Sequence, residues 1–216
     1  MDTKTHIYIT TTALKMLDDK SLNELKDGII HYSTQPDFDE NESGYKGHFY
    51  NPSTGKNFVD GYDSALSRFY KHYENAIESK KNNLDGSTSL GRAIHYLEDL
   101  CTPVHTYNQD IFDAAINISS HVFFENRCND LVEQIKDEEL PKKINVDYFS
   151  ENKLKTIGIN ASLASSILFH KYSKIKHKSD VDGLAIQAIM NGIKNTYGIL
   201  YRYSISIGTT TSAGGI

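Results

Sequence analysis

The sequence predicts an all-α fold, a single compact multi-helix domain with two long loops. In several segments the apolar residues recur every three or four positions, which is the spacing of one buried helix face. No segment shows the two-residue alternation of a half-buried strand, and the sequence contains no internal repeat. The 216 residues are enough for one large domain with a hydrophobic core.

The first half of the chain is expected to contain four helices. Ser21 and Glu24 have the spacing of a capping box, which predicts that the second helix begins there. Pro103 cannot continue a helix, so the fourth ends before it. The spacing of apolar residues then places the four helices at 5–18, 21–31, 60–80 and 90–101.

Two irregular segments interrupt this helical pattern. Residues 33–57 and 105–118 lack helical spacing, and a loop as long as the first is uncommon inside a compact domain and is usually functional. The first loop is broken by Pro36, Gly44, Gly47, Pro52 and Gly55.

The second half of the chain is expected to contain three helices and a flexible end. Ser119 or Ser120 caps the first of them. The final residues are small, polar and rich in glycine, so the predicted domain covers 1–207 and the predicted tail 208–216. The three helices are expected at 119–137, 152–174 and 180–203.

Composition bounds the class of partner. The formal net charge is −5 and no stripe of Lys and Arg is present, which argues against nucleic acid as a partner, although metal ions could neutralise phosphates locally. No apolar run approaches the length of a membrane span, and the first residues lack the apolar stretch of a signal peptide. Cys101 and Cys128 could pair in a secreted protein or could be two buried free thiols.

Histidines and carboxylates at helical spacing are the most informative feature. His95 and Asp99 are four residues apart, as are His121 and Glu125, so each pair lies on one helix face. His105 follows Pro103 and can fold back beside the first pair. Such pairs present two ligands to one zinc ion. Because two pairs and further histidines exceed the needs of one ion, the pattern indicates a multi-metal site, which is typical of phosphate-ester hydrolysis.

Several segments of the chain resemble the bacterial zinc-dependent phospholipases C. That family includes the clostridial alpha-toxins and is more distantly similar to the fungal-type zinc nucleases. The similar segments follow the family's order within about residues 5–130, and as a set they are highly specific. They are residues 5–6, 34–39, 47–52, 91–99, 103–108 and 120–125.

The resemblance implies two to three zinc ions, with Asp99 bridging two of them. Asp37 would lie beside the bridging water, as general base or as a further ligand. Phe38 and Tyr45 occupy positions where family members place aromatic residues around the substrate headgroup, or they could simply pack the loop. By position, one zinc would be held by His48, His95 and Asp99, a second by His105, His121 and Glu125, and a third by His6 and Asp99.

The chain departs from the family at its N-terminus and beside Asp99. A mature N-terminal Trp supplies the third zinc with two ligands in the family, whereas this chain contains no Trp. A free amino group on Met1 could take its place, and a blocked or extended one would leave a third zinc weak or absent. Glu98 stands where the family usually has a small Gly, which could reshape the pocket.

The resemblance implies a secreted, monomeric phospholipase C that releases a phosphorylated headgroup, such as phosphorylcholine, from glycerophospholipids at a membrane surface. At this length the sequence has no room for the β-domain of the larger toxins. A zinc-dependent nuclease or 3′-nucleotidase is the alternative, favoured by the short spacing from Met1 to His6. A non-catalytic zinc-binding domain ranks third, because a loop carboxylate such as Asp37 has no evident structural role.

Overall fold

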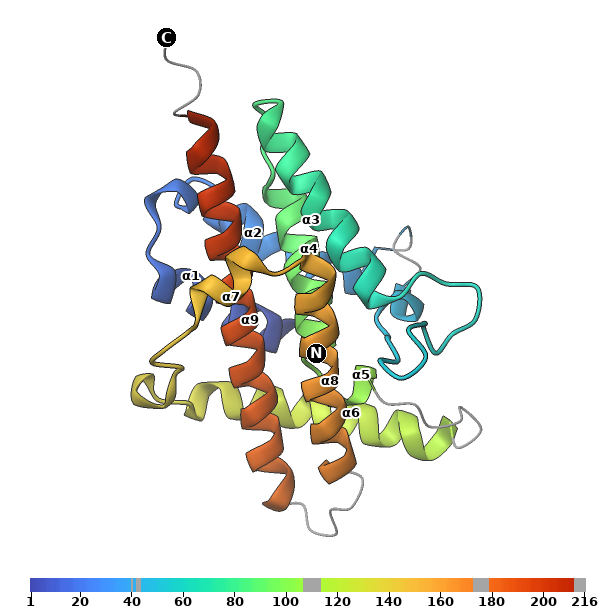
Figure 1. Cartoon of the computed structure of the whole chain (residues 1–216). Coiled ribbons are helices and arrows are strands. Elements are labelled where there is room, and N and C mark those ends of the chain that lie inside the picture. The colour runs from blue at the N-terminus through green and yellow to red at the C-terminus, as the bar shows by residue number, and fades with distance from the viewer. Residues whose placement is uncertain (40, 42–43, 107–113, 173–178, 212–216) are drawn as a thin grey trace.

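Helices form nearly all the regular structure of the computed structural model, which describes residues 1–39, 41, 44–106, 114–172 and 179–211 (Figure 1). The predicted all-α class is confirmed. Within those ranges the β-type pairing is limited to one isolated bridge between Asn51 and Lys56. The α-helices are α1 (Thr3–Leu17), α2 (Lys26–Tyr32), α3 (Ala65–Lys81), α4 (Ser87–Leu100), α5 (Pro103–Thr106), α6 (Ala114–Leu131), α7 (Val146–Glu151), α8 (Leu154–Tyr172) and α9 (Ser179–Thr211).

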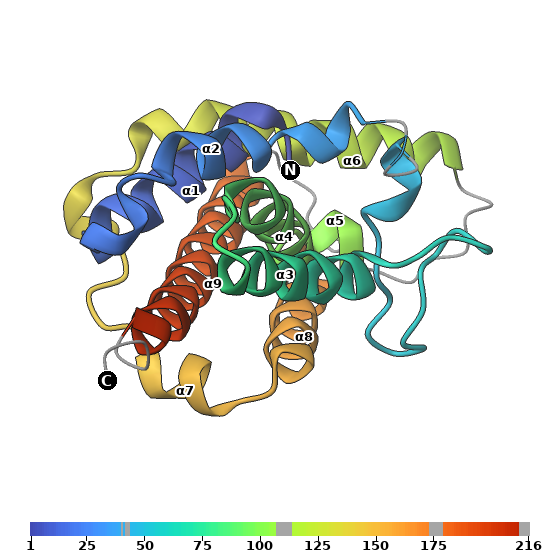
Figure 2. The same ribbon diagram turned by 90° about the horizontal axis from the view of Figure 1, so that it is seen from above.

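Helix α4 lies at the centre of the domain. Figure 2 shows α1, α2 and α6 along one side, α3, α4 and α9 in the middle, and α7 and α8 on the opposite side. Leu90, Ile94 and Leu97 of α4 are fully buried in one hydrophobic cluster with residues of α3, α8 and α9. A second cluster, which includes Ile9 and Phe124, joins α1, α6 and α9. The packed helices hold α4 rigidly, so side chains on it have fixed positions.

The first helices differ from prediction in how they begin. Asp19, rather than Ser21, accepts the capping hydrogen bonds, and it caps a short 3₁₀ turn at Lys20–Leu22. The capping box at Ser21 is therefore wrong, and α2 begins later, at Lys26. Helix α3 also begins later than expected, because the side chain of Ser64 accepts from the backbone N–H of Ser67 and caps it.

The two loops contain more helix than expected. The first includes 3₁₀ turns at Gln35–Asp37 and Gly44–Gly47. Pro103 opens the short helix α5 instead of only ending α4. The described backbone of α6 begins at Ala114, so the caps at Ser119 or Ser120 are wrong; two alanines favour helix in that first turn.

The C-terminal region also differs from expectation. Helix α7 was not predicted, although Asn145 caps it by accepting from the N–H of Tyr148. Helix α9 continues to Thr211, past the expected end at 203 and into the segment expected to be a tail. Residues 212–216 of that segment lie outside the described residues.

Two further observations bear on the sequence expectations. Along the described part of the chain, no helix combines the length and the apolar character that crossing a membrane requires. Cys101 and Cys128 are both buried and unpaired, which corresponds to the free-thiol alternative.

Candidate metal centre

Helix α4 supplies the central ligands, and a close helix crossing positions them. A Cβ atom at Gly91 would lie 2.6 Å from the carbonyl oxygen of Ile29 and 2.7 Å from Cβ of Tyr32, so only glycine allows α2 to pack this tightly on α4. The close approach brings the carbonyl of Ser33, just after α2, to 2.8 Å from Nδ1 of His95. Nδ1–H of His95 donates to this carbonyl, which directs Nε2 at the other ligands and makes it the nitrogen that binds a metal once the ring is neutral.

The first group of side chains gathers around His95. Its Nε2 lies 3.0 Å from Nδ1 of His48, 3.5 Å from Oδ1 of Asp37 and 3.3 Å from Oδ2 of Asp99. Nδ1 of His48 lies 2.7 Å from Oδ2 of Asp99. The segment that carries His48 is held in place because the N–H of Tyr50 donates to the carbonyl of His105 at 3.0 Å.

The second group joins α5 to α6. Nε2 of His105 lies 3.3 Å from Nε2 of His121 and 3.1 Å from Oε1 of Glu125. His121 and Glu125 are one turn apart on α6, and Nε2 of His121 lies 3.2 Å from Oε1 of Glu125. Nδ1 of His105 lies 2.9 Å from Oδ1 of Asp99, so Asp99 connects this group to the first.

The third group lies at the N-terminus. The ring of His6 stacks on that of His95 at 4.2 Å, and Nε2 of His6 lies 3.9 Å from Oδ1 of Asp99. The amino group of Met1 is buried, 3.1 Å from Oδ1 of Asp99 and 3.3 Å from Oε1 of Glu125. Figure 2 shows the N-terminus close to α4 and α6. The structure thus brings together all eight residues that the sequence predicted as metal ligands.

The donor atoms fit zinc. Three groups place their ligand atoms within 4.8 Å of one another: His6, His95 and Asp99; Asp37, His48 and His95; His105, His121 and Glu125. Imidazole nitrogens and carboxylate oxygens are the usual zinc ligands. The facing ring nitrogens, at 3.0 Å and 3.3 Å, lie near the separation of about 3.3 Å expected for two nitrogen ligands of a tetrahedral zinc ion. Among the described side chains, the buried Nε2 of His6 has no hydrogen-bond partner, as expected of a nitrogen that serves as a metal ligand.

Charge within the cluster shifts the pKa values of its members in the absence of metal. Burial lowers the pKa of the Met1 amine, but the carboxylates of Asp99, Glu125 and Asp37 outweigh burial and raise it to about 11. The same balance of burial against Asp99 and Asp37 raises the pKa of His95 to about 9. Burial, with help from His95 and the Met1 amine, holds the pKa of His6 well below its usual value. The protonated groups carry the positive charge that balances the carboxylates when no metal is bound.

The cluster meets solvent at Asp37 and, to a lesser degree, at His121 and Glu125. The carboxylate of Asp37 is 29% exposed, whereas the side chains of His6, His95 and Asp99 are fully buried. Phe38, the next residue along the chain, is 69% exposed. Tyr45 belongs to the 3₁₀ turn at Gly44–Gly47, but its side chain lies outside the described residues.

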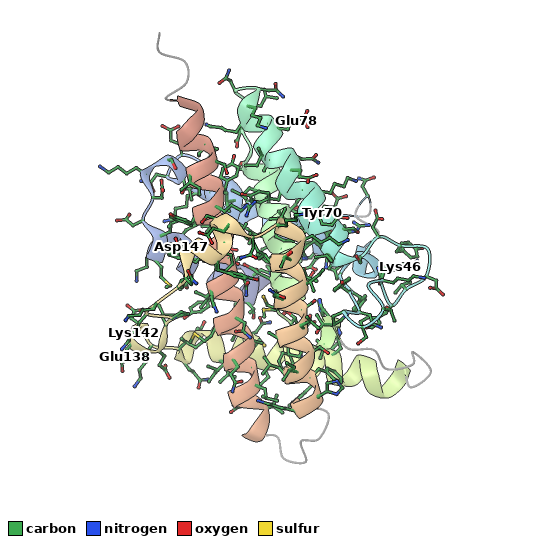
Figure 3. The ribbon with its side chains drawn as sticks, viewed as in Figure 1. Lys46, Tyr70, Glu78, Glu138, Lys142 and Asp147 are labelled. Atoms are coloured by element: carbon green, nitrogen blue, oxygen red, sulfur yellow. The ribbon has the colours of Figure 1, made fainter. Side chains whose placement is uncertain are left out.

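Polar contacts hold the loop that runs from the 3₁₀ turn at Gly44–Gly47 to the start of α3. Nδ2 of Asn57 donates to the carbonyls of Lys46 and Asp63 at 2.7 and 2.8 Å. The ammonium group of Lys46 donates to the hydroxyl of Tyr62 at 2.9 Å, and Figure 3 shows Lys46 on the loop side of the molecule. These contacts fix the turn that immediately precedes His48.

Two contributors to the site were missed by sequence reasoning. The carbonyl of Ser33 orients His95, and no side-chain pattern reports a backbone oxygen. Glu98 contacts His6, although the sequence identified it only as a departure from the family. Thr10, which also contacts Glu98, is four residues after His6 and so shares its helix face, a spacing that could have indicated the contact.

Comparison with known proteins gives the same family as the motifs. The family model described as zinc-dependent phospholipase C matches residues 5–202. The chain belongs to this family. A phospholipase C from Paraclostridium bifermentans is 29% identical over 96% of this chain and 61% of its own length. A phospholipase C from Clostridium perfringens strain 13 is 28% identical over 98% of this chain and 62% of its own.

Solved structures have the same fold. The alpha-toxin from Clostridium absonum superimposes with a TM-score of 0.80 at 24% identity, covering 94% of this chain and 64% of the toxin. An alpha-toxin from an avian strain of Clostridium perfringens superimposes with a TM-score of 0.76 at 23% identity, covering 98% of this chain and 64% of the toxin. The chain therefore spans a little over three fifths of the length of these relatives.

Proposed function

We propose that this protein is a zinc-dependent phosphodiester hydrolase, and specifically a phospholipase C that releases a phosphorylated headgroup such as phosphorylcholine. The observation that carries the proposal is the convergence of three ligand groups: His95 belongs to two of them, and Asp99 lies within 3.3 Å of His48, His95 and His105 and so connects all three. A shared carboxylate can set two metal ions close together, and close metal pairs are the machinery of phosphate-ester hydrolysis. The family membership supports the same chemistry.

We assign the ligands as the motifs imply. His48, His95 and Asp99 hold one zinc, with Asp37 beside it. His105, His121 and Glu125 hold a second, and His6 with Asp99 holds a third. The distances support this assignment, because each set lies within one of the three groups or is bridged by Asp99.

Bound zinc supplies a water of lowered pKa and neutralises negative charge on the phosphate oxygens. The chain's own residues then orient the reaction. The carboxylate of Asp37, partly exposed and 3.5 Å from Nε2 of His95, is placed to hold a water at the open side and to accept its proton. Asp99 and the buried histidines His6, His48, His95 and His105 exclude water from their part of the cluster, which strengthens the electrostatic interactions at the reacting phosphate.

The open side argues against a purely structural zinc site. Structural sites are closed by protein ligands, whereas catalytic sites keep a position for water or substrate. Here the carboxylate of Asp37 is partly exposed beside His95, and the ring of Phe38, the next residue along the chain, is exposed. Phe38 and Tyr45 are proposed to contact the headgroup, where an aromatic face attracts a choline ammonium by roughly 0.5–2 kcal/mol.

Phospholipid is the proposed substrate, met at a membrane surface by a secreted monomer. The similar proteins are named phospholipase C, and this supports lipid over nucleic acid. The formal net charge of −5 points the same way, since nucleic acid binding relies on clustered Lys and Arg.

The substrate is tested by supplying the zinc-loaded protein with phosphatidylcholine vesicles and, separately, with single-stranded DNA and a 3′-nucleotide. We expect phosphorylcholine release from the vesicles and little hydrolysis of the nucleic acid substrates. Nuclease activity without lipid hydrolysis would assign the same metal centre to the alternative function.

A further inference from the structure

Glu98 is a fully buried carboxylate next to the metal centre that belongs to none of its ligand groups. It follows Leu97 on α4, where consecutive residues point about 100° apart. Asp99 therefore faces the cluster while Glu98 reaches behind it, toward α1 and α9. A buried carboxylate is costly unless hydrogen bonds satisfy it, so its contacts indicate what it does.

The carboxylate of Glu98 has three side-chain partners from two other helices. Oε2 lies 2.5 Å from Nδ1 of His6. Oε1 accepts hydrogen bonds from the hydroxyls of Thr10 and Thr196, each at 3.0 Å. One side chain of α4 is thus fastened to both α1 and α9, and two hydroxyl donors fix its position.

The contact determines which nitrogen of His6 carries the proton. Nε2 of His6 is buried, has no hydrogen-bond partner among the described residues and lies 3.9 Å from Asp99, beyond hydrogen-bond distance. A proton on Nε2 would be a buried donor without an acceptor. A proton on Nδ1 is instead donated to Glu98. The contacts therefore assign the Nδ1–H tautomer, with the lone pair of Nε2 facing Asp99.

Two independent contacts then fix the ring of His6. Stacking on His95 at 4.2 Å sets the plane of the ring, and the hydrogen bond to Glu98 sets its rotation within that plane. Carboxylates that hold a ligating histidine in this way raise its basicity toward the metal, and their removal typically costs about 10–100-fold in metal affinity.

We propose that Glu98 is a positioning residue of the zinc centre, which holds His6 in the tautomer and orientation that present Nε2 as a ligand, with Thr10 and Thr196 holding Glu98 in turn. The inference rests on the zinc centre of the proposed function. Glu98 itself contacts neither the metal nor the substrate.

The test compares variants that differ in the hydrogen-bond acceptor that they present to Nδ1 of His6. Glu98→Leu removes the acceptor, whereas Glu98→Gln keeps an acceptor oxygen of the same shape without the charge. The double variant Thr10→Val, Thr196→Val loosens Glu98 and leaves every ligand in place. Thr12→Val, on the same helix as Thr10, is the matched control because the side-chain hydrogen bond described for Thr12 is with Tyr8 and not with Glu98.

Two measurements are made on each variant: zinc affinity in competition with a chelator, and the protonation of the His6 nitrogens by ¹⁵N NMR of the metal-free protein. We expect about a 10–100-fold loss of affinity at one zinc site in Glu98→Leu, with a smaller loss in Glu98→Gln and the double variant. We also expect the Nδ1–H tautomer in the wild type and the control, with the Nε2–H form appearing in Glu98→Leu.

Unchanged affinity and an unchanged His6 tautomer in Glu98→Leu would overturn the inference. If that variant does not fold, the same two measurements on Glu98→Gln and on the double variant decide it. A wild-type protein that binds no zinc would instead overturn the proposed function. The tautomer of the metal-free protein still reports whether Glu98 orients His6 in that case, so the two failures are distinguishable.

Discussion

The guanidinium of Arg92 donates a hydrogen bond of 2.6 Å to the carboxylate of Asp39. Arg92 is one turn before His95 on α4, and Asp39 is two residues after Asp37 in the loop. The pair therefore fastens the loop that carries the proposed general base to the helix that carries the central ligands. The pKa of Asp39 is lowered, chiefly by this hydrogen bond.

Asp39→Asn should weaken this connection and reduce turnover without loss of zinc. Because the pair is partly exposed, we expect a stability cost of no more than about 1 kcal/mol. Turnover on phosphatidylcholine should fall several-fold as Asp37 becomes less well placed. Asp182→Asn, which breaks an Arg–Asp pair between α6 and α9, is the matched control and should leave turnover nearly unchanged. Equal effects of the two substitutions would argue against a positioning role for the Arg92 pair.

Asp37→Asn tests the proposed base directly. The amide keeps the size of the side chain but cannot accept a proton from water. We expect zinc content close to wild type, because the neighbouring histidines and Asp99 remain, and a fall in turnover of roughly 10²–10⁴-fold. Metal analysis together with a phosphorylcholine assay checks both. Full activity of this variant would show that Asp37 is not the general base.

Gly91→Ala tests whether the α2–α4 crossing positions His95. The added methyl group would meet the backbone of Ile29 and Tyr32 at less than 3 Å, so α2 must move. We expect a loss of about 1–3 kcal/mol in the free energy of unfolding, with weaker zinc binding as the Ser33 carbonyl withdraws from His95. Denaturant unfolding and a chelator titration measure the two effects.

Gly183→Ala is the control for this substitution. Gly183 lies in α9, and a Cβ atom added there would meet no other atom within 4 Å, so alanine should be neutral or stabilising by up to about 1 kcal/mol. If Gly91→Ala behaved like Gly183→Ala in both measurements, the close crossing would not be what sets the position of His95.

Zinc binding should release protons, because groups in the cluster are protonated when no metal is bound. The pKa of His95 is raised to about 9 and that of the Met1 amine to about 11, so both groups are protonated at pH 7.5. Their charge favours the folded metal-free protein below these values, and this contribution is lost as the pH rises through them. A bound zinc ion supplies the positive charge that these two protons otherwise provide, so its binding displaces them. Zinc affinity should therefore rise between pH 7 and 9.

Titration calorimetry in buffers of different ionisation enthalpy counts the released protons. We expect at least one per protein at pH 7.5 and a corresponding rise in affinity with pH. A heat that is independent of the buffer, together with a flat pH profile, would contradict the described charge balance.

The part of the site that the sequence could predict is the part set by local spacing. His95 with Asp99, and His121 with Glu125, are each one turn apart on a helix, and any helix through them presents the pair on one face. The position of His105 follows from Pro103, which turns the chain after α4. The membership of His6 and His48 came from the resemblance to the family, since helical spacing does not say which distant segments meet.

What the sequence could not predict depends on tertiary contacts. Glu98 is held by Thr10 and Thr196, which lie 88 and 98 residues away. The role of Gly91 depends on how closely α2 approaches. Among the helices, the starting point of α6 was misjudged because serine is a good cap but is also tolerated inside a helix, so the cap signal at Ser119 and Ser120 was not decisive.

Release of phosphorylcholine before and after removal of the metal tests the central claim most directly. The protein is stripped with a chelator, assayed on phosphatidylcholine vesicles, and assayed again after zinc is restored. We predict that stripping abolishes release and that zinc restores it, with Asp37→Asn remaining inactive after reconstitution. Release that survives complete removal of zinc, or a zinc-loaded protein that hydrolyses no phospholipid, would contradict the account.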